Sequence, residues 1–285
     1  APEAVMKLCF LAGLLLLVAV PANAAKSAGS TDEEQIIYLQ QVDSAIRQGR
    51  LTQAGQMIAA LESAGTNRFP DDFALLKAEY AIARMDVKSA SFALSAIQDP
   101  ARNLCRMHAA KGWVSANQNA FNSAVDALSV ATEHCPDDAG IWNLFGLALI
   151  GKGEAATAQK AFEHALALDP GNAQLINNHA LASLQDGDVE RALRELDSAL
   201  ALNPHDPMIK ANRNFAAGMT GLSPERTTGE SDADWSAKLL QYAKGAKSAS
   251  RGTQATAFFA RAMLTLERFD EAIWSELYPE SESPL

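Results

Sequence analysis

The hydrophobic pattern of this chain is that of helices rather than strands. Alternating apolar and polar residues, which mark a half-buried strand, extend for no more than a few residues anywhere. Alanine and leucine, which favour helix, are abundant, and runs of β-branched residues are scarce. We therefore predict an all-α protein, and its 285 residues, 48% of them hydrophobic, are enough to bury a core.

Large and small apolar residues recur with a period of about 34 residues. In a unit that begins at Ala139, large side chains fall at positions 4, 7, 11 and 24, small ones at 8, 20 and 27, and proline at 32. These are, in the same order, Trp142, Phe145, Leu149, Phe162, Gly146, Ala158, Ala165 and Pro170. One unit later, positions 8, 20, 24, 27 and 32 hold Ala180, Ala192, Leu196, Ala199 and Pro204, and one unit earlier Gly112, Ala124, Leu128, Ala131 and Pro136. Two further units precede these, with Ala78, Ala90 and Leu94 in one, and Gly49, Ala54, Ile58 and Leu61 in the first, which begins near Gln35.

This pattern resembles the tetratricopeptide repeat (TPR) family. Small residues at positions 8, 20 and 27 let two antiparallel helices approach closely, and the large residues fill the space between units. Proline at position 32 stops the second helix, because it has no amide hydrogen. The resemblance implies a right-handed solenoid of antiparallel helix pairs, followed by a degenerate C-terminal helical pair.

The period and the changes in composition divide the chain. We predict units at 35–70, 71–104, 105–138, 139–172 and 173–206, with a capping helix at 207–221, so that the solenoid covers 35–221. The Ser-, Thr-, Gly- and acid-rich stretch at 222–233 is predicted to be a linker. A C-terminal helical pair follows at 234–277, in which Trp235 and Trp274 are expected to pack, and a tail at 278–285.

The sequence GKG at Gly151 to Gly153 invites a nucleotide-binding interpretation. A phosphate-binding loop needs glycines after a strand, and Gly-Lys-Ser/Thr opening a helix. Here the three residues fall at the turn inside a repeat, and neither Ser nor Thr follows Lys152. We therefore expect Gly153 to close a helix with its permissive backbone.

The first residues carry an export signal. Lys7 precedes the apolar run CFLAGLLLLVAV, and the run ends at PANAA, where Ala22 and Ala24 form the small-x-small pattern of signal-peptidase cleavage. We predict a signal peptide at 1–24, a flexible segment at 25–34, and a periplasmic or otherwise exported protein. The alternative is that an uncleaved signal anchors the chain.

Two cysteines, Cys105 and Cys135, follow the predicted signal. They occupy positions 1 and 31 of one unit, and an antiparallel hairpin brings its two ends together. In an oxidising compartment they could form a disulfide, provided that their Cα atoms lie within about 7 Å. Two free buried thiols are the alternative.

Charge and motifs exclude several classes of function. The formal net charge of -10 disfavours nucleic acid, because that partner requires clustered Lys and Arg. The five histidines do not form the HExxH metal motif, and GxSxG is absent. We predict no enzyme activity, no metal and no small-molecule cofactor.

The family resemblance also implies a binding surface. In TPR proteins the first helices of successive units line a concave groove that binds a protein or an extended peptide, chiefly through positions 2, 5, 6, 9, 12 and 13. Here those positions predict a groove made of amides and apolar residues, in which Asn can donate to and accept from a peptide backbone. The candidates are Arg106, Trp113, Asn117, Asn143, Leu147, Asn177, Asn178, Leu181, Gln185, Asn212 and Phe215.

These observations together indicate an exported, non-enzymatic scaffold. An exported repeat protein of this size resembles the TPR component of tight-adherence (Flp/Tad) pilus assembly, which implies a role in building the cell envelope. The alternatives are an accessory protein for secretin or polysaccharide export, and an enzyme without a recognisable motif.

Overall fold

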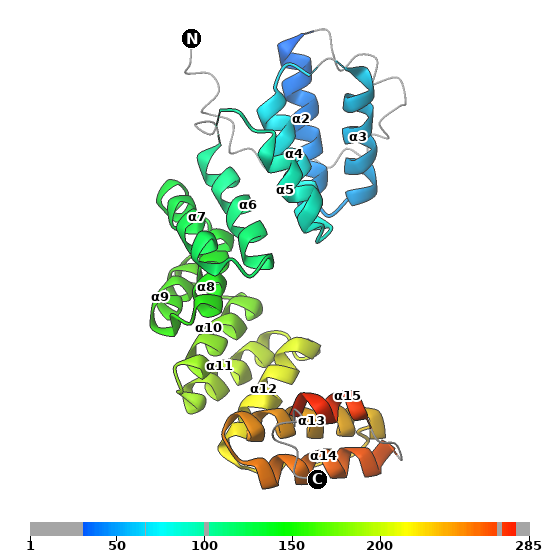
Figure 1. The fold of residues 1–285 in the computed structure, drawn as a ribbon, viewed down its shortest axis with the longest axis vertical. Coiled ribbons are helices and arrows are strands. Elements are labelled where there is room, and N and C mark those ends of the chain that lie inside the picture. The colour runs from blue at the N-terminus through cyan, green and yellow to red at the C-terminus, as the bar shows by residue number, and fades with distance from the viewer. Residues whose placement is uncertain (1–30, 66, 100–102, 267–269, 278–285) are drawn as a thin grey trace.

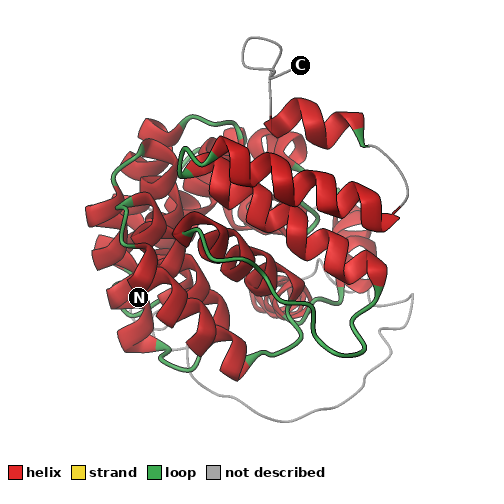
Figure 2. Ribbon diagram, turned by 90° about the horizontal axis from the view of Figure 1, so that it is seen from below, coloured by secondary structure: helices red, strands yellow, loops and turns green. Residues whose placement is uncertain are grey.

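The computed structural model describes residues 31–65, 67–99, 103–266 and 270–277, and within these ranges every regular element is a helix (Figures 1 and 2). The predicted signal peptide, most of the segment at 25–34 and the tail at 278–285 lie outside the described residues. The helices are α2 (Asp32–Arg47), α3 (Leu51–Ala64), α4 (Pro70–Ala83), α5 (Val87–Ser95), α6 (Leu104–Asn117), α7 (Phe121–His134), α8 (Ala139–Lys152), α9 (Ala155–Leu168), α10 (Ala173–Gln185), α11 (Val189–Leu202), α12 (Pro207–Thr220), α13 (Asp232–Ser248), α14 (Gly252–Leu266) and α15 (Glu271–Leu277).

The helices from α2 to α11 form five consecutive hairpins that stack into a right-handed solenoid (Figure 1). The first helix of each hairpin packs beside the first helix of the next, so that α2, α4, α6, α8, α10 and α12 form one layer. The second helices form the other layer, and each packs on the first helix of the following unit. The all-α solenoid predicted from the sequence is confirmed.

A residue with positive φ marks the turn inside each unit. From the second unit onward these residues are 34 positions apart, at Met85, Asn119, Gly153, Gly187 and Gly221, with φ between 58° and 89°. Such a conformation favours glycine. In the unit with GKG, the first two residues end α8 and Gly153 is its C-cap, with its N–H 3.0 Å from the carbonyl oxygen of Ile150. The GKG sequence is therefore a helix terminus between two helices, not a loop after a strand.

Small residues at position 8 set the spacing inside each hairpin. A Cβ on Gly112 would overlap the side chain of Leu128, and one on Gly146 would overlap the ring of Phe162. Leu128 and Phe162 are fully buried at position 24 of their units. The second helix thus packs a large side chain against the backbone of a glycine on the first helix, which is the packing that the sequence pattern predicts.

The regular hairpin alternation stops at α12. The N-terminal halves of α12 and α13 line one cleft, whereas Gly218 and Gly245, near their C-terminal ends, are in contact with backbone of the other helix. The two helices therefore run parallel, and the segment from 222 to 231 returns along them. The sequence suggested a helical pair at 234–277, but the structure has α13, α14 and α15 there.

The three C-terminal helices dock on the solenoid. Their hydrophobic cluster includes Ala217 of α12, and Leu193 of α11 packs against it. Trp235 is buried in this cluster, and the rings of Phe259 and Trp274 lie 5.1 Å apart, so both tryptophans contribute to packing. The C-terminal helices are continuous with the solenoid core.

Candidate functional site

All eleven residues predicted for the groove lie on α6, α8 and α10, the first helices of three consecutive units, and on the capping helix α12. These helices pack side by side in one layer. We refer to the surface of this layer as the first-helix face. The structure therefore brings the predicted residues onto one surface, although their side chains have different roles there.

Four asparagines form a hydrogen-bonded chain across three helices of this face. Asn212 of α12 donates to Asn177 of α10 at 2.8 Å, Asn177 donates to its neighbour Asn178 at 3.1 Å, and Asn178 donates to Asn143 of α8 at 2.8 Å. We call this set the asparagine ladder. Asn177 is fully buried, and the other three are half-buried. The ladder links units to one another, so several of the amides expected to bind a peptide backbone are already engaged.

A column of apolar side chains runs beside the ladder. Position 9 holds Trp113, Leu147, Leu181 and Phe215, one on each successive first helix. Residues three and four apart share one side of a helix, so position 9 lies one turn beyond the ladder positions 5 and 6. Leu147 is 36% exposed, and the other three are half-buried. Leu147 is thus the exposed member of this apolar column, and Trp113 also packs against the hydrophobic core of the neighbouring helices.

Arg106 joins the N-terminal first helices. Its Nη2 lies 2.5 Å from the carboxylate of Asp43 on α2, and its Nε donates to Glu79 on α4 at 2.8 Å. Burial opposes the charge on the guanidinium, but the Glu79 and Asp43 carboxylates outweigh it and raise the pKa of Arg106 above its ordinary value. Arg106, predicted as a groove residue, thus holds three units together, as the ladder does further along.

Two other predicted residues bond to nearby backbone. Asn117 donates to the carbonyl of Trp113 in its own helix at 2.8 Å, and Gln185 donates across one unit to the carbonyl of Ile150 at 3.0 Å. Both side chains are exposed. They lie at the C-terminal ends of their helices, at one edge of the first-helix face.

A buried polar network that the sequence did not reveal lies between α10 and α11. His179, 5% exposed, pairs through Nδ1 with Glu195 at 3.0 Å, while its Nε2 lies 3.2 Å from the guanidinium of Arg191. Ser183 donates to the other oxygen of Glu195 at 3.0 Å. Burial raises the pKa of Glu195, but hydrogen bonds and charge from His179 and Arg191 outweigh it, and the net pKa is lowered.

This network is not arranged for nucleophilic catalysis. A hydroxyl nucleophile must reach the free nitrogen of the histidine, but Ser183 is bonded to the acid, and Arg191 occupies the second histidine nitrogen. The signal in the sequence is the polar His179 at position 7, where the preceding unit has Phe145. We interpret the network as a link between two helices.

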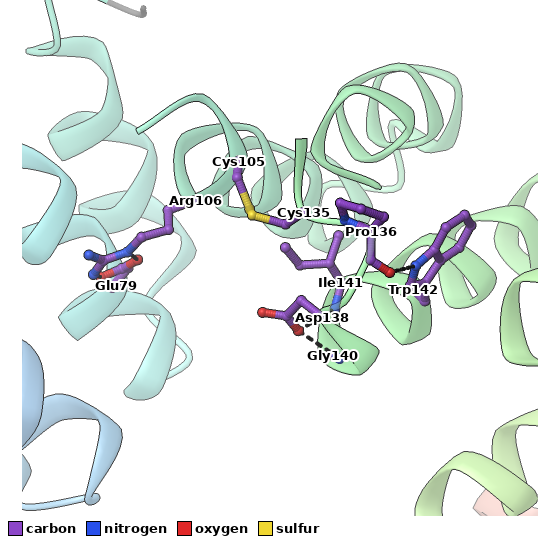
Figure 3. The surroundings of a disulfide bond; sticks show 9 residues. All are labelled: Glu79, Cys105, Arg106, Cys135, Pro136, Asp138, Gly140, Ile141 and Trp142. Carbon is purple, nitrogen blue, oxygen red and sulfur yellow. Dashed lines mark hydrogen bonds and ion pairs between the residues drawn. A yellow bond between two sulfur atoms is a disulfide. The ribbon is translucent and has the colours of Figure 1, made fainter. Parts of the chain in front are cut away.

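Cys105 and Cys135 form a disulfide in the structure, with Cα atoms 5.9 Å apart (Figure 3). Cys105 lies in the first turn of α6, and Cys135 is the C-cap of α7. The bond therefore closes the open end of one hairpin. Next to it, Trp142 donates from Nε1 to the carbonyl of Pro136 at 2.7 Å, which fixes the entry of the chain into α8.

Metal and membrane sites were sought in the part of the chain that the structure describes. There, no group of three or more His, Cys, Asp or Glu side chains could hold a metal ion. Nor is any helix in those ranges long and apolar enough to cross a membrane.

The fold and this face define an α-solenoid, a class of protein that offers an extended surface along stacked helical hairpins. The chain contains tetratricopeptide repeats. The family profile described as tetratricopeptide repeat matches residues 149–212, the second half of the solenoid. No curated protein sequence matches the chain.

Solved structures share the fold at low sequence identity. One, described as "Functional Characterization of Pseudomonas Aeruginosa pilF", is 16% identical, with a TM-score of 0.50, and the match covers 86% of this chain and 96% of that one. YrrB, described as a TPR protein with an unusual peptide-binding site, is 18% identical, with a TM-score of 0.50 and coverage of 70% and 98%. MamA MSR-1 is 23% identical, with a TM-score of 0.47 and coverage of 61% and 98%. At these identities the likeness to the first two structures shows the fold alone.

Proposed function

We propose that this protein is an exported, non-enzymatic scaffold that binds a protein or an extended peptide on its first-helix face. The observation that carries the proposal is the apolar column, which has one member on each of the four consecutive helices α6, α8, α10 and α12. A row of one apolar side chain per unit suits a long, narrow partner better than a small molecule. The description of YrrB as having a peptide-binding site is consistent with this role.

The asparagine ladder changes the predicted way of binding. The sequence suggested that Asn177 and Asn178 bond directly to a peptide backbone, yet both are engaged in bonds within and between units. We therefore assign affinity to apolar contacts with the column, and rigidity of the surface to the ladder. A surface that is already ordered loses less conformational entropy on binding.

The biological setting is a second part of the proposal. The apolar run and small-x-small site near Ala24 support export by a cleaved signal, with retention as an anchor the alternative. Within the envelope we propose pilus biogenesis of the Flp/Tad type. The fold likeness to the Pseudomonas aeruginosa structure described as pilF does not distinguish this from an accessory role in secretin or polysaccharide export.

A photo-crosslinking experiment tests the binding face. A photoreactive amino acid at Leu147 should capture a partner in cell-envelope extract, and the partner's identity would separate pilus assembly from secretin or polysaccharide export. The double variant Leu147→Ser, Leu181→Ser should lose this partner in affinity purification, because it removes apolar surface from two adjacent units.

The matched control is Leu168→Ser with Leu202→Ser. These leucines are 42% and 53% exposed, at the ends of second helices α9 and α11, away from the column. If the control pair lost the partner equally, or if the column variant retained it, binding on the first-helix face would be refuted. N-terminal sequencing of the exported protein tests the signal separately, with Ala25 the expected first residue.

A further inference from the structure

The middle of the first-helix face is almost free of charge, which limits the partner that it can accept. Of the charged residue types, α8 contains only Lys152 and α10 contains none, although these types make up 20% of the chain. Lys152 ends α8 and pairs with Glu154 at 2.8 Å. An ionised side chain placed against Leu147 or Leu181 would lose water without gaining a counter-charge, which is costly. The middle of the face therefore favours an uncharged segment.

The flanking helices α6 and α12 do not change this selection. Arg106 of α6 is already engaged by carboxylates of α2 and α4. Lys111 of α6, and Lys210 and Arg213 of α12, lie two or five residues before the column position, which turns them to other sides of their helices. None of the four helices carries Asp or Glu, so a cationic segment finds no counter-charge on them either.

The face also offers few free groups for hydrogen bonds to a peptide backbone. The ladder asparagines bond to one another, and Asn117 and Gln185 bond to carbonyl oxygens of the protein. A peptide that binds as a β-strand needs a row of partners for its N–H and C=O groups. A polyproline II segment keeps its backbone hydrated, and its prolines have no N–H to satisfy. This conformation therefore suits a face whose amides are already engaged.

The spacing of the column fits the same conformation. Cα atoms of α6 and α8, of α8 and α10, and of α10 and α12 come within 8 Å of each other, so neighbouring axes are about 9 Å apart. Polyproline II has three residues per turn, and every third residue returns to the same side after about 9.3 Å. Residues on one side of a strand are about 6.7 Å apart, and those of an α-helix about 5.4 Å or, at seven residues, about 10.5 Å. Over four helices, polyproline II keeps the closest step with the column.

We propose that the first-helix face binds an uncharged polyproline II segment with an apolar residue at every third position. Four such residues would contact Trp113, Leu147, Leu181 and Phe215 in turn. The inference rests on the proposed function, because it uses the same column, and it adds the chemistry and the conformation of the partner. Since polyproline II is stiff before it binds, little conformational entropy is lost in the complex.

Binding of synthetic peptides to the full chain, measured by calorimetry, tests the proposal. Acetyl-LPPLPPLPPL-amide places leucine at every third position, and acetyl-LLPPPPPPLL-amide has the same composition without that period. Acetyl-LPPEPPEPPL-amide and acetyl-LPPKPPKPPL-amide place charges opposite the middle of the face. We expect the period-three peptide to bind at least about tenfold more tightly than each of the other three, a difference of about 1.4 kcal/mol.

NMR of the ¹⁵N-labelled protein locates the bound peptide, which should shift the amide signals of the four column residues. The double variant Leu147→Ser, Leu181→Ser should bind the period-three peptide at least about tenfold more weakly, because it removes apolar surface at the middle of the column. The control pair Leu168→Ser, Leu202→Ser should bind it as the wild type does. Thermal unfolding of both double variants shows that they are folded.

Absence of shifts along the column would overturn the proposal, as would equal binding of the composition-matched peptide or of either charged peptide. Equal weakening by the control pair would overturn it too. A helical peptide of alanine and glutamine, with leucine at every seventh position, is the last probe. If it bound the column more tightly than the period-three peptide, the inference would be wrong and the proposed function would stand. The proposed function fails instead if photo-crosslinking at Leu147 captures no partner, so the two failures are distinguishable.

Discussion

Replacing Asn177 with alanine tests whether the asparagine ladder is a structural element. The side chain is fully buried, accepts a hydrogen bond from Asn212 and donates one to Asn178. Each neutral hydrogen bond contributes about 1 kcal/mol to stability, so the loss of both removes about 2 kcal/mol. The space left by the amide adds about 1 kcal/mol, because buried cavities are costly. We expect the free energy of unfolding to fall by about 3 kcal/mol.

Two other asparagines provide a graded comparison. Asn143→Ala removes one ladder bond at a half-buried position, and should cost about 1 kcal/mol. Asn117→Ala removes a bond within one helix at an exposed position, and should cost close to nothing because alanine is a better helix former.

Urea unfolding followed by circular dichroism measures the three values. Repeat proteins can unfold unit by unit, so hydrogen exchange should also be measured, and protection should fall most in α10 and α12. If Asn177→Ala and Asn117→Ala were equally stable, the ladder would not hold the units together. In that case its asparagines would again be candidates for direct contact with a peptide.

Three further predictions concern other links in the structure. Gly245→Ala should destabilise the protein by more than about 2 kcal/mol in thermal unfolding, because the new Cβ meets rigid backbone, whereas Gly171→Ala, with open space around it, should have little effect. Cys105→Ser with Cys135→Ser should lower the free energy of unfolding by about 3–4 kcal/mol, the loop-closure effect expected for a separation of 30 residues, and full alkylation of nonreduced exported protein would contradict the bond. Because the folded-state pKa of Glu195 is lowered, its carboxylate stabilises the folded protein above the ordinary pKa of 4.5, and this stabilisation is lost as pH falls through the folded pKa. The free energies of unfolding of the wild type and of Glu195→Gln, measured over a pH series, should therefore converge in acid. A constant difference between them would refute the assignment.

The repeat architecture could be predicted because its signal is local and periodic. Gly146 at position 8 and Phe162 at position 24 contact each other, so a small residue at the first position and a large one at the second indicate the same packing contact. Five units in register repeat that evidence. The turn residues with positive φ follow the same period, although Met85 and Asn119 are not glycine.

The roles of the asparagines could not be predicted with the same ease. Asn143 and Asn178 are 35 residues apart, as are Asn177 and Asn212, which is one unit plus one residue. That spacing is a signal for bonds between units, but its interpretation requires the relative rotation of neighbouring helices. A polar residue on a binding face can bind a ligand or link the helices of the scaffold, and the side-chain geometry distinguishes these roles.

The direction of α13 also lies beyond the repeat pattern. Inside a unit, helices are joined by short turns such as Gly153 and Glu154, and a short turn forces the second helix to run antiparallel. Between Gly221 and Asp232 the connection is long enough to return along α12, so α13 can run parallel to it. In the sequence, this change of helix direction is indicated by the length of the segment predicted to be a linker.

The parallel arrangement of α13 separates two surfaces that a regular sixth unit would not have. An antiparallel second helix that starts directly after α12 would leave no returning segment, and residues 227–230 would not close a cleft beside Lys210. Meanwhile α12 still carries Asn212 and Phe215, which complete the ladder and the column. The helix α12 thus contributes both to the column and to the wall of the cleft.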